Sequence, residues 1–169
     1  MKLSICMMVK NEESNLERCL NSLENLRSKI SNELIIVDTG STDRTMEIAK
    51  AYDVRLYEHK WNNNFSEMRN ISISYAKGEW LMIIDADEEL VEDKALIKQL
   101  GQENKGVNAI ALELENIITS KGKKGSKIVT MRLFRNDGKF HYNGVVHNMP
   151  AVEGTVIKVD ALLNHYGYI

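Results

Sequence analysis

The sequence has little of what marks disordered, disulfide-rich or secreted chains. It contains one proline, 10 glycines and 2 cysteines in 169 residues. So little proline and glycine argues against long disordered or low-complexity segments. Cys6 and Cys19 have neither redox-motif nor zinc-site spacing, so we predict two reduced, packed thiols. The amino terminus has the pattern of a strand rather than of a signal peptide. These absences favour a cytoplasmic protein.

Two further absences exclude kinds of partner. No apolar run reaches the roughly 20 residues of a membrane-spanning helix, so any association with a membrane would be peripheral. The formal net charge is -2 and the isoelectric point is about 6.1. The chain therefore lacks the excess of positive charge that is typical of proteins that bind nucleic acid. The hydrophobic share of 43% suits a globular protein with one core. We therefore predict a single domain over residues 1–169.

Residues 1–100 alternate between the patterns of strands and helices. Short apolar strands separated by amphipathic helices require right-handed crossovers and a largely parallel sheet. We expect Gly78 to be the C-cap of the third helix. The predicted strands are Leu3–Val9, Leu34–Val37 and Val54–Tyr57, and the predicted helices are Ser14–Leu26, Asp43–Tyr52, Ser66–Lys77 and Asp93–Gln99.

From Val107 onward the pattern changes to longer strands. Val107–Leu114 and Ile128–Phe134 flank a basic loop that we expect to be a hairpin or lid, and Thr155–Leu163 is the last predicted strand. The predicted fold class is thus α/β, with three layers, α/β/α. A mainly parallel central sheet belongs to residues 1–100, and a smaller antiparallel part belongs to residues 101–169. The lysines of the basic loop, expected to form a solvated face or to close over a ligand, are Lys121, Lys123, Lys124 and Lys127.

The stretch from Trp80 to Glu89 carries the strongest chemical signal. Its apolar run indicates a strand buried on both faces, and carboxylates at the end of such a strand lie where open α/β sheets bind ligands. Because two close carboxylates repel each other, we expect a positive group between Asp85 and Asp87. Oxygen ligands favour Mg²⁺ or Mn²⁺, which commonly bind through carboxylates and substrate phosphates. The residues alone therefore predict a divalent cation that holds a phosphorylated substrate.

Other residues near these strand ends have two interpretations each. Asp38 could accept hydrogen bonds from a nucleobase or a ribose hydroxyl, or it could only cap the turn through Gly40. Trp61 could stack on a sugar or base, although core packing is the expected role. Glu88 and Glu89 would favour the start of the following helix, and Glu88 could also tune a metal site.

Several segments together resemble family 2 glycosyltransferases, which have the GT-A fold. The resemblance is clearest over residues 1–100. It implies an inverting enzyme that moves a sugar from a nucleotide-diphosphate donor, most often UDP-linked, to an acceptor hydroxyl. The segments that resemble the family are Ser4–Glu12, Ile35–Asp43 and Asp85–Glu88, and those similar to one branch of it are Phe65–Asn70, Arg132–Arg135, Val146–His147 and His165–Tyr168.

The resemblance also implies roles for individual residues. Asp38 would contact the base, Arg69 would lie near the diphosphate or Asp85, and Asp85 would approach the ribose or the metal. The expected cofactor is Mn²⁺ or Mg²⁺. The implied nucleotide-sugar contacts are Val9, Asn11, Glu12, Asp38, Arg69, Asp85 and Ala86, and the implied metal ligands are Asp85, Asp87 and His165.

The catalytic base departs from the family pattern. The family's valine-histidine pair is commonly followed by glutamate, whereas this chain has Asn148, and an amide cannot accept the proton. His147 or Glu153 would then be the catalytic base, with Glu113 and Glu115 as further candidates. His147 could instead be a packed histidine of the core.

Two other functions are compatible with the sequence. A phosphatase-like enzyme would use Asp85 as nucleophile and Asp87 as acid, but that arrangement usually follows a first strand. A nucleotide-sugar-binding domain without catalysis would explain Asn148. The acceptor could be a glycan, a lipid-linked glycan or a protein. Relatives often continue further, so we expect the catalytic core of a longer protein, with an apolar C-terminal edge open to homodimer formation.

Overall fold

The computed structural model describes residues 1–119, 121–145 and 149–167. One mixed sheet of 8 strands has the order β3-β2-β1-β4-β7-β6-β10-β5, and β8 and β9 form a separate hairpin. The strands are β1 (Leu3–Val9), β2 (Asn32–Asp38), β3 (Arg55–Glu58), β4 (Trp80–Ile83), β5 (Glu88–Glu92), β6 (Val107–Ile117), β7 (Lys124–Arg135), β8 (His141–Asn143), β9 (Met149–Ala151) and β10 (Thr155–His165). The helices are α1 (Leu16–Ser22), α2 (Glu24–Lys29), α3 (Thr45–Lys50), α4 (Phe65–Ser74) and α5 (Lys94–Leu100).

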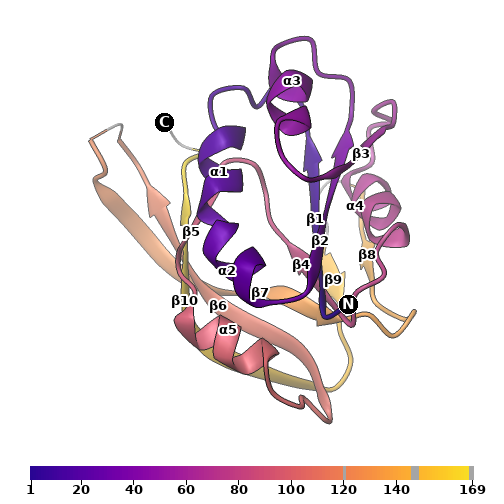
Figure 1. Cartoon of the computed structure of the whole chain (residues 1–169), viewed down its shortest axis with the longest axis vertical. Helices are drawn as coiled ribbons and strands as arrows, with labels where there is room; N and C mark the ends of the chain where they lie inside the picture. The colour runs from indigo at the N-terminus through magenta and orange to yellow at the C-terminus, as the bar shows by residue number, and fades with distance from the viewer. Residues whose placement is uncertain (120, 146–148, 168–169) are drawn as a thin grey trace.

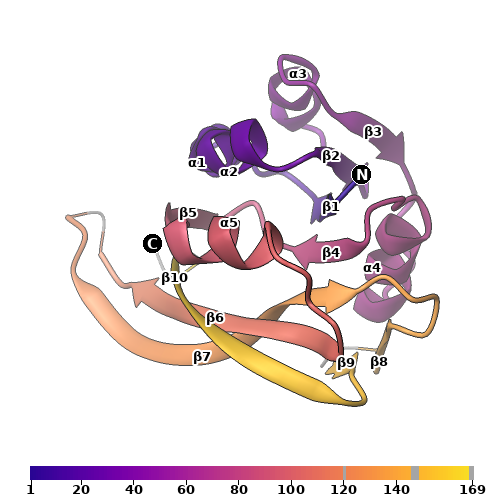
Figure 2. The same ribbon diagram turned by 60° about the horizontal axis from the view of Figure 1, so that its bottom comes forward.

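Helices lie on both faces of the large sheet, which confirms the predicted three layers (Figures 1 and 2). On one face, Leu20 of α1 and Leu96 of α5 belong to the same buried cluster as Ile5 of β1. On the other face, Ile73 of α4 packs against the cluster that contains Phe134 of β7. Among the described residues, no helix is long and apolar enough to span a membrane.

The strand directions confirm a mainly parallel sheet. β1 pairs in parallel with β2 and β4, and β2 pairs in parallel with β3. The direction changes at β7, which is antiparallel to both β4 and β6. β10 is parallel to β6 and antiparallel to β5, so the second half is itself mixed. Both halves share one continuous sheet.

Several element boundaries differ from the sequence prediction for local reasons. The predicted helix Ser14–Leu26 is two short helices, α1 and α2. Helix α3 begins at Thr45, because Asp43 Oδ1 accepts the Thr45 backbone N–H at 3.0 Å. Glu88 and Glu89 begin strand β5 instead of a helix. The β8–β9 hairpin had no clear pattern in the sequence.

The C-terminal strand does not provide the open edge that was expected for a homodimer. Leu162–His165 of β10 pairs with β5 on one side and with β6 on the other. An additional strand therefore has no free backbone to pair with along Leu162–His165. Residues 168 and 169 lie outside the described residues, and the homodimer stays a prediction.

Gly78 is required by a close approach of two backbones and not by a helix cap. Helix α4 ends at Ser74 and its C-cap is Tyr75. A Cβ on Gly78 would lie 2.5 Å from the backbone nitrogen of Ser4. The Ser4 hydroxyl accepts the Gly78 N–H at 2.8 Å. The predicted C-cap is therefore wrong, and glycine instead lets the chain entering β4 lie against β1.

We expect Gly78→Ala to lower the free energy of unfolding by about 1–3 kcal/mol, because the added methyl group must displace backbone. Urea unfolding measures this change. Gly101→Ala is the matched control, since a Cβ there would meet only the carbonyl oxygens of Ile97 and Lys98, at 3.4 and 3.5 Å. Equal losses in the two variants would contradict the explanation.

A buried carboxylate joins β2 to three other segments. Glu33 is 8% exposed and accepts hydrogen bonds from Ser4 Oγ at 2.6 Å, Lys77 N at 2.7 Å and Arg55 Nη1 at 2.5 Å. Burial alone would raise the pKa of Glu33, but these hydrogen bonds outweigh burial and lower the pKa. A carboxylate with a lowered pKa stabilises the fold above its ordinary pKa of about 4.3, and this contribution is lost as the pH falls through the folded pKa.

Glu33→Gln is expected to lower the free energy of unfolding by about 1–3 kcal/mol at neutral pH, because an amide cannot accept all three hydrogen bonds. The difference from the wild type should shrink below about pH 4.3, where the wild-type carboxylate also becomes protonated. Urea unfolding over a pH series tests this, and a difference that does not change with pH would refute it.

Candidate active site

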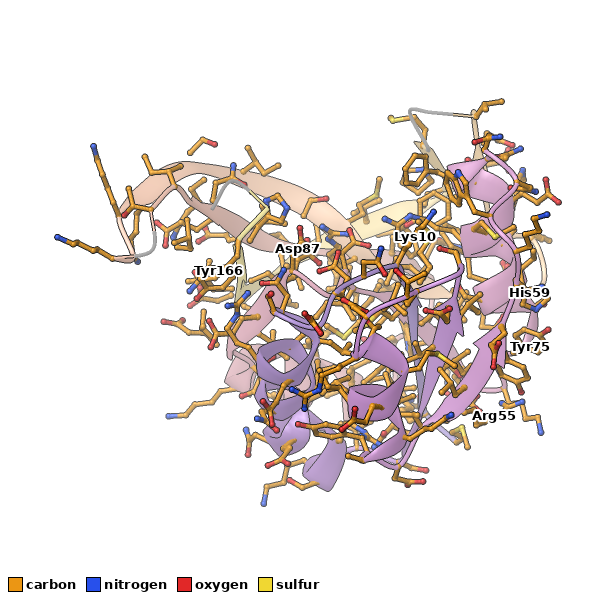
Figure 3. All side chains as sticks on the ribbon, turned by 90° about the horizontal axis from the view of Figure 1, so that it is seen from above. Lys10, Arg55, His59, Tyr75, Asp87 and Tyr166 are labelled. Carbon is orange, nitrogen blue, oxygen red and sulfur yellow. The ribbon has the colours of Figure 1, made fainter. Side chains whose placement is uncertain are left out.

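Three parallel strands bring their carboxyl ends to one edge of the sheet. β1 lies between β2 and β4, with Val9 opposite Asp38. A cleft of about 360 Å³ opens here. Figure 3 shows Asp87 at this edge, between Lys10 and Tyr166. The cleft brings together seven residues predicted from the sequence: Val9, Glu12, Arg69, Asp85, Ala86, Asp87 and His165.

Asp85 is paired with two arginines, one from α4 and one from β7. Arg69 Nη2 in α4 donates to both carboxylate oxygens, at 2.9 and 3.1 Å. Arg132 Nη1 in β7 lies 3.9 Å from Asp85 Oδ2. Burial alone would raise the pKa of Asp85, but the two guanidinium groups outweigh it and lower the pKa. The carboxylate therefore stays ionised, and the predicted proximity of Arg69 to Asp85 is confirmed.

Glu88 forms a buried hydrogen bond with the backbone of Asp85. The side chain of Glu88 is 1% exposed, and its Oε2 accepts the Asp85 backbone N–H at 3.0 Å. Its Oε1 accepts a hydrogen bond from Arg132 Nη2. Burial raises the pKa of Glu88, although the charge of Arg132 opposes the shift. Sequence reasoning identified neither this pair nor any role for Arg132, because the two residues are distant in the chain.

Asp87 and His165 form a second polar pair at the mouth of the cleft. Asp87 Oδ2 lies 3.3 Å from His165 Nε2. The other ring nitrogen, Nδ1, lies 2.8 Å from Asn116 Oδ1. The Asn116 amide nitrogen donates to Ser126 Oγ at 2.7 Å. Asn116 thus contacts Nδ1, and Nε2 is directed toward Asp87. The hydrogen bond with Asp87 raises the pKa of His165.

The Asp87–His165 pair fits a divalent cation better than the predicted set of three ligands does. Carboxylate oxygen and imidazole nitrogen are both ligands of Mn²⁺, and the contact with Asn116 is the kind of support that orients a metal-bound histidine. Asp85 instead forms its hydrogen bonds with Arg69. Among the described residues, no group of three or more potential ligand side chains is arranged to hold a metal ion. Substrate phosphates and water would complete the coordination of a bound cation.

Asn11 and Asp38 are not among the residues that line the cleft. Both form hydrogen bonds with the loop that follows β2. Asn11 Oδ1 accepts the Thr42 N–H at 2.8 Å, and the Asn11 N–H donates to Ser41 Oγ at 2.9 Å. Asp38 Oδ2 accepts the N–H groups of Gly40 and Ser41, at 2.9 and 3.0 Å, which is the turn-capping role. Asp38 Oδ1 is buried and lacks a hydrogen-bond partner among the described atoms. This orphaned acceptor is the observation that keeps Asp38 a candidate for contact with a ligand.

Two aromatic residues line the cleft, and stacking of Trp61 on a sugar or base, the alternative role considered from the sequence, stays a prediction. Trp61 and Phe65 contact each other edge to face, with ring centroids 4.7 Å apart, and both line the cleft. The expected core packing of Trp61 is wrong, since Trp61 belongs to neither buried cluster. A tryptophan inside a polar loop was the only signal available. Lys10, Met8 and Thr39 also line the cleft.

Three of the predicted bases, Glu153, Glu113 and Glu115, are not among the residues that line the cleft. Glu153 lines a different cavity with Asn108 and Arg135, and Arg135 pairs with the first residue of β4, at the opposite end of that strand from Asp85. Lys158 and Lys127 lower the pKa of Glu113 to about 2, which makes it a poor proton acceptor. Glu115 Oε2 lies 2.7 Å from Lys124 Nζ. His147 and Asn148 lie outside the described residues.

The comparisons with known proteins agree with this geometry. The profile described as "Glycosyl transferase family 2" matches residues 4–156. A TPR repeat-containing protein from Synechococcus elongatus is 31% identical over 99% of this chain and 42% of its own length. The glycosyltransferase SunS from Bacillus subtilis is 32% identical over 96% of this chain and 39% of its own. The chain thus spans about two fifths of these relatives, and it belongs to glycosyl transferase family 2.

Solved structures show the same fold at lower sequence identity. TarS from S. aureus in complex with UDP has a TM-score of 0.63 and 19% identity over 85% of this chain and 50% of its own. The mannosyltransferase PcManGT from Pyrobaculum calidifontis, in complex with GDP-Man and Mn²⁺, has a TM-score of 0.54 and 20% identity over 64% of this chain and 34% of its own. The chain therefore has the GT-A fold of these enzymes.

Gly167 provides a test of how the Asp87–His165 pair is positioned. A Cβ on Gly167 would lie 2.7 Å from both Asp87 Oδ2 and His165 Nε2. We expect Gly167→Ala to displace the imidazole and change its NMR ring signals, with little change in global stability because residue 167 follows the last strand. Gly101→Ala, at the C-cap of α5, should leave these signals unchanged. Unaltered ring signals in Gly167→Ala would contradict the described packing.

Proposed function

We propose that this domain transfers a sugar from a nucleoside-diphosphate donor, in the first instance UDP-linked, to an acceptor hydroxyl with inversion of the anomeric carbon. A divalent cation, Mn²⁺ or Mg²⁺, would be held by Asp87 and His165. The observation that carries the proposal is the position of this pair beside the Arg69–Asp85 ion pair, in a cleft at the ends of parallel strands.

The cleft supplies the groups that such a donor needs. Trp61 offers a flat apolar surface for a base or sugar, and Lys10 and Arg69 offer positive charge to a diphosphate. When bound, the cation would neutralise charge on the leaving diphosphate. Known structures of the fold support the ligand class: TarS was solved with UDP and with UDP-GlcNAc, and PcManGT with GDP-Man and Mn²⁺.

The transfer balances as a single displacement. The acceptor oxygen forms a bond to the anomeric carbon, and the bond from that carbon to the diphosphate oxygen breaks with its electron pair. The hydroxyl proton passes to a base or to solvent, and His147 stays the predicted base. Arg69 is placed to stabilise the charge that gathers on the leaving group, and its hydrogen bonds with Asp85 keep the guanidinium oriented.

Asp87→Ala should abolish the metal-dependent part of UDP binding, because it removes the carboxylate that faces His165 Nε2. Asp53→Ala is the control, since the side chain of Asp53 is fully exposed and is not part of the cleft lining. Calorimetric titration with UDP, in Mn²⁺ and in chelator, measures the effect. Equal metal-dependent affinity in wild type and Asp87→Ala would refute the assignment.

The same titration, repeated with other donors, identifies the preferred nucleobase, and an assay with acceptors tests for catalysis. UDP, GDP and dTDP sugars compared in Mn²⁺ identify the preferred donor, since a ligand that binds the folded state also raises the melting temperature. Binding without release of the nucleoside diphosphate in the presence of acceptors would favour the non-catalytic alternative. Absence of binding for every donor would contradict the proposed function.

A further inference from the structure

Strand β7 has a long backbone edge that no described strand covers. On one side, β7 pairs with β6 from Phe134 to Lys124. On the other side it pairs with β4 only through Leu133–Arg135. Because β4 ends at Ile83, the stretch from Lys124 to Arg132 is unpaired on that side. At about 3.3 Å per residue, this open edge is about 30 Å long.

The side chains along the open edge are unusually exposed for a strand. Ile128 and Val129 point to opposite faces of the sheet and are 52% and 56% exposed. Neither face is therefore covered at this point. Figures 1 and 2 show the β6–β7 hairpin projecting well beyond the helices. Proteins usually protect such an edge, because its free N–H and C=O groups can pair with another chain.

The inner end of the open edge reaches the candidate active site. A cavity of about 430 Å³ lies between β7 and the β8–β9 hairpin, and Thr130, Met131 and Arg132 form its β7 wall. Tyr142 and Met149 lie on the side of the hairpin, and Arg69 lines both this cavity and the donor cleft. A molecule bound along β7 would therefore lead directly to the reacting end of a donor.

The chemistry of the edge favours an extended peptide over a glycan. A row of free backbone N–H and C=O groups matches the spacing of another extended backbone. The cavity at its inner end is lined by apolar side chains (Ala111, Val129, Met131, Met149 and Pro150) and by the polar groups of Arg69, Thr130, Arg132 and Tyr142. A glycan has no repeating row of N–H and C=O groups that could pair with the strand edge.

The charges beside the edge favour acidic residues in such a peptide. Four exposed lysines lie on the β6–β7 hairpin: Lys121, Lys123, Lys124 and Lys127. Lys124 pairs with Glu115, and Lys127 pairs with Glu113. Among the described residues, Lys121 and Lys123 form no ion pair with a carboxylate, so the positive charge on the hairpin exceeds the negative charge.

We propose that the open edge of β7 binds the acceptor, an extended acidic peptide segment that adds a strand to the sheet and places its hydroxyl side chain beside Arg69 and Arg132. This inference rests on the proposed function, since it names the acceptor class of the same site. The peptide hydroxyl oxygen then bonds to the anomeric carbon, the donor C–O bond breaks toward the nucleoside diphosphate, and the hydroxyl proton passes to a base or to solvent.

Amide hydrogen exchange of the whole chain tests this with two defined probes. One is a short peptide in which glutamate and valine alternate around a central serine, and the other has lysine in place of each glutamate. The acidic peptide should slow exchange at Lys124–Arg132, and the basic peptide should not. Protection by neither peptide, or equally by both, would overturn the proposal. Protection of this edge at high protein concentration without peptide would also overturn it, in favour of a second copy as the occupant.

Proline substitutions test the backbone pairing directly. Neighbouring residues of a strand direct their N–H groups to opposite sides. Of the variants Val129→Pro and Thr130→Pro, one therefore removes an N–H that faces β6 and the other removes an N–H on the open side of β7. The variant that loses the N–H facing β6 should be destabilised, and the other should unfold like the wild type. In the stable variant, the affinity for the acidic peptide should fall about ten-fold, with UDP affinity unchanged. Unchanged peptide affinity in the stable variant would overturn the proposal.

Charge reversal provides a third readout that does not depend on the backbone. Lys121→Glu combined with Lys123→Glu should weaken binding of the acidic peptide, whereas Lys98→Glu on the exposed side of α5 should not.

The failure of this inference is distinguishable from the failure of the proposed function. Metal-dependent UDP binding without protection of β7 rejects only the peptide site, and protection of β7 without UDP binding rejects only the donor site.

Discussion

The early end of strand β4 is the constraint on which the rest of the structure depends. β4 has only 4 residues, whereas its neighbours β1 and β7 have 7 and 12. Because β4 stops at Ile83, the chain turns through Asp85, Ala86 and Asp87 at the same sheet edge where β1 and β2 end. The same early end leaves β7 without a partner from Lys124 to Arg132. A cleft and an open strand edge therefore arise side by side from one short strand.

A network of buried charges maintains this turn. Glu88 accepts the backbone N–H of Asp85 and pairs with Arg132, while Arg69 pairs with the Asp85 carboxylate. Each of the two carboxylates thus has a guanidinium partner, and removal of any one member would leave another charge buried without its partner. Since Arg69 comes from α4 and Arg132 from β7, the network also connects the two halves of the chain. Asp87 is not part of this network and contacts His165 instead.

Sequence reasoning predicted the fold well, because strand and helix patterns in residues 1–100 are local. It also predicted that Asp85 and Asp87 follow a buried strand. It could not predict that Asp85 pairs with an arginine and Asp87 with His165, because that division depends on where the strand ends and on a contact between distant residues. The roles of Arg132 and Gly167 depend on packing between elements and were missed for the same reason. Glu153 was expected near the cleft, but β10 begins at the far end of the sheet.

The cation site that we propose consists of Asp87 and His165. A titration of the ¹⁵N-labelled chain with Mn²⁺ in the presence of UDP tests this site most directly, because bound Mn²⁺ broadens the signals of nearby amides. We expect the amides of Asp87, Tyr166 and Gly167 to broaden first and the effect to need UDP. Earlier broadening around Glu113 and Glu115, with the Asp87 region unaffected, would contradict it.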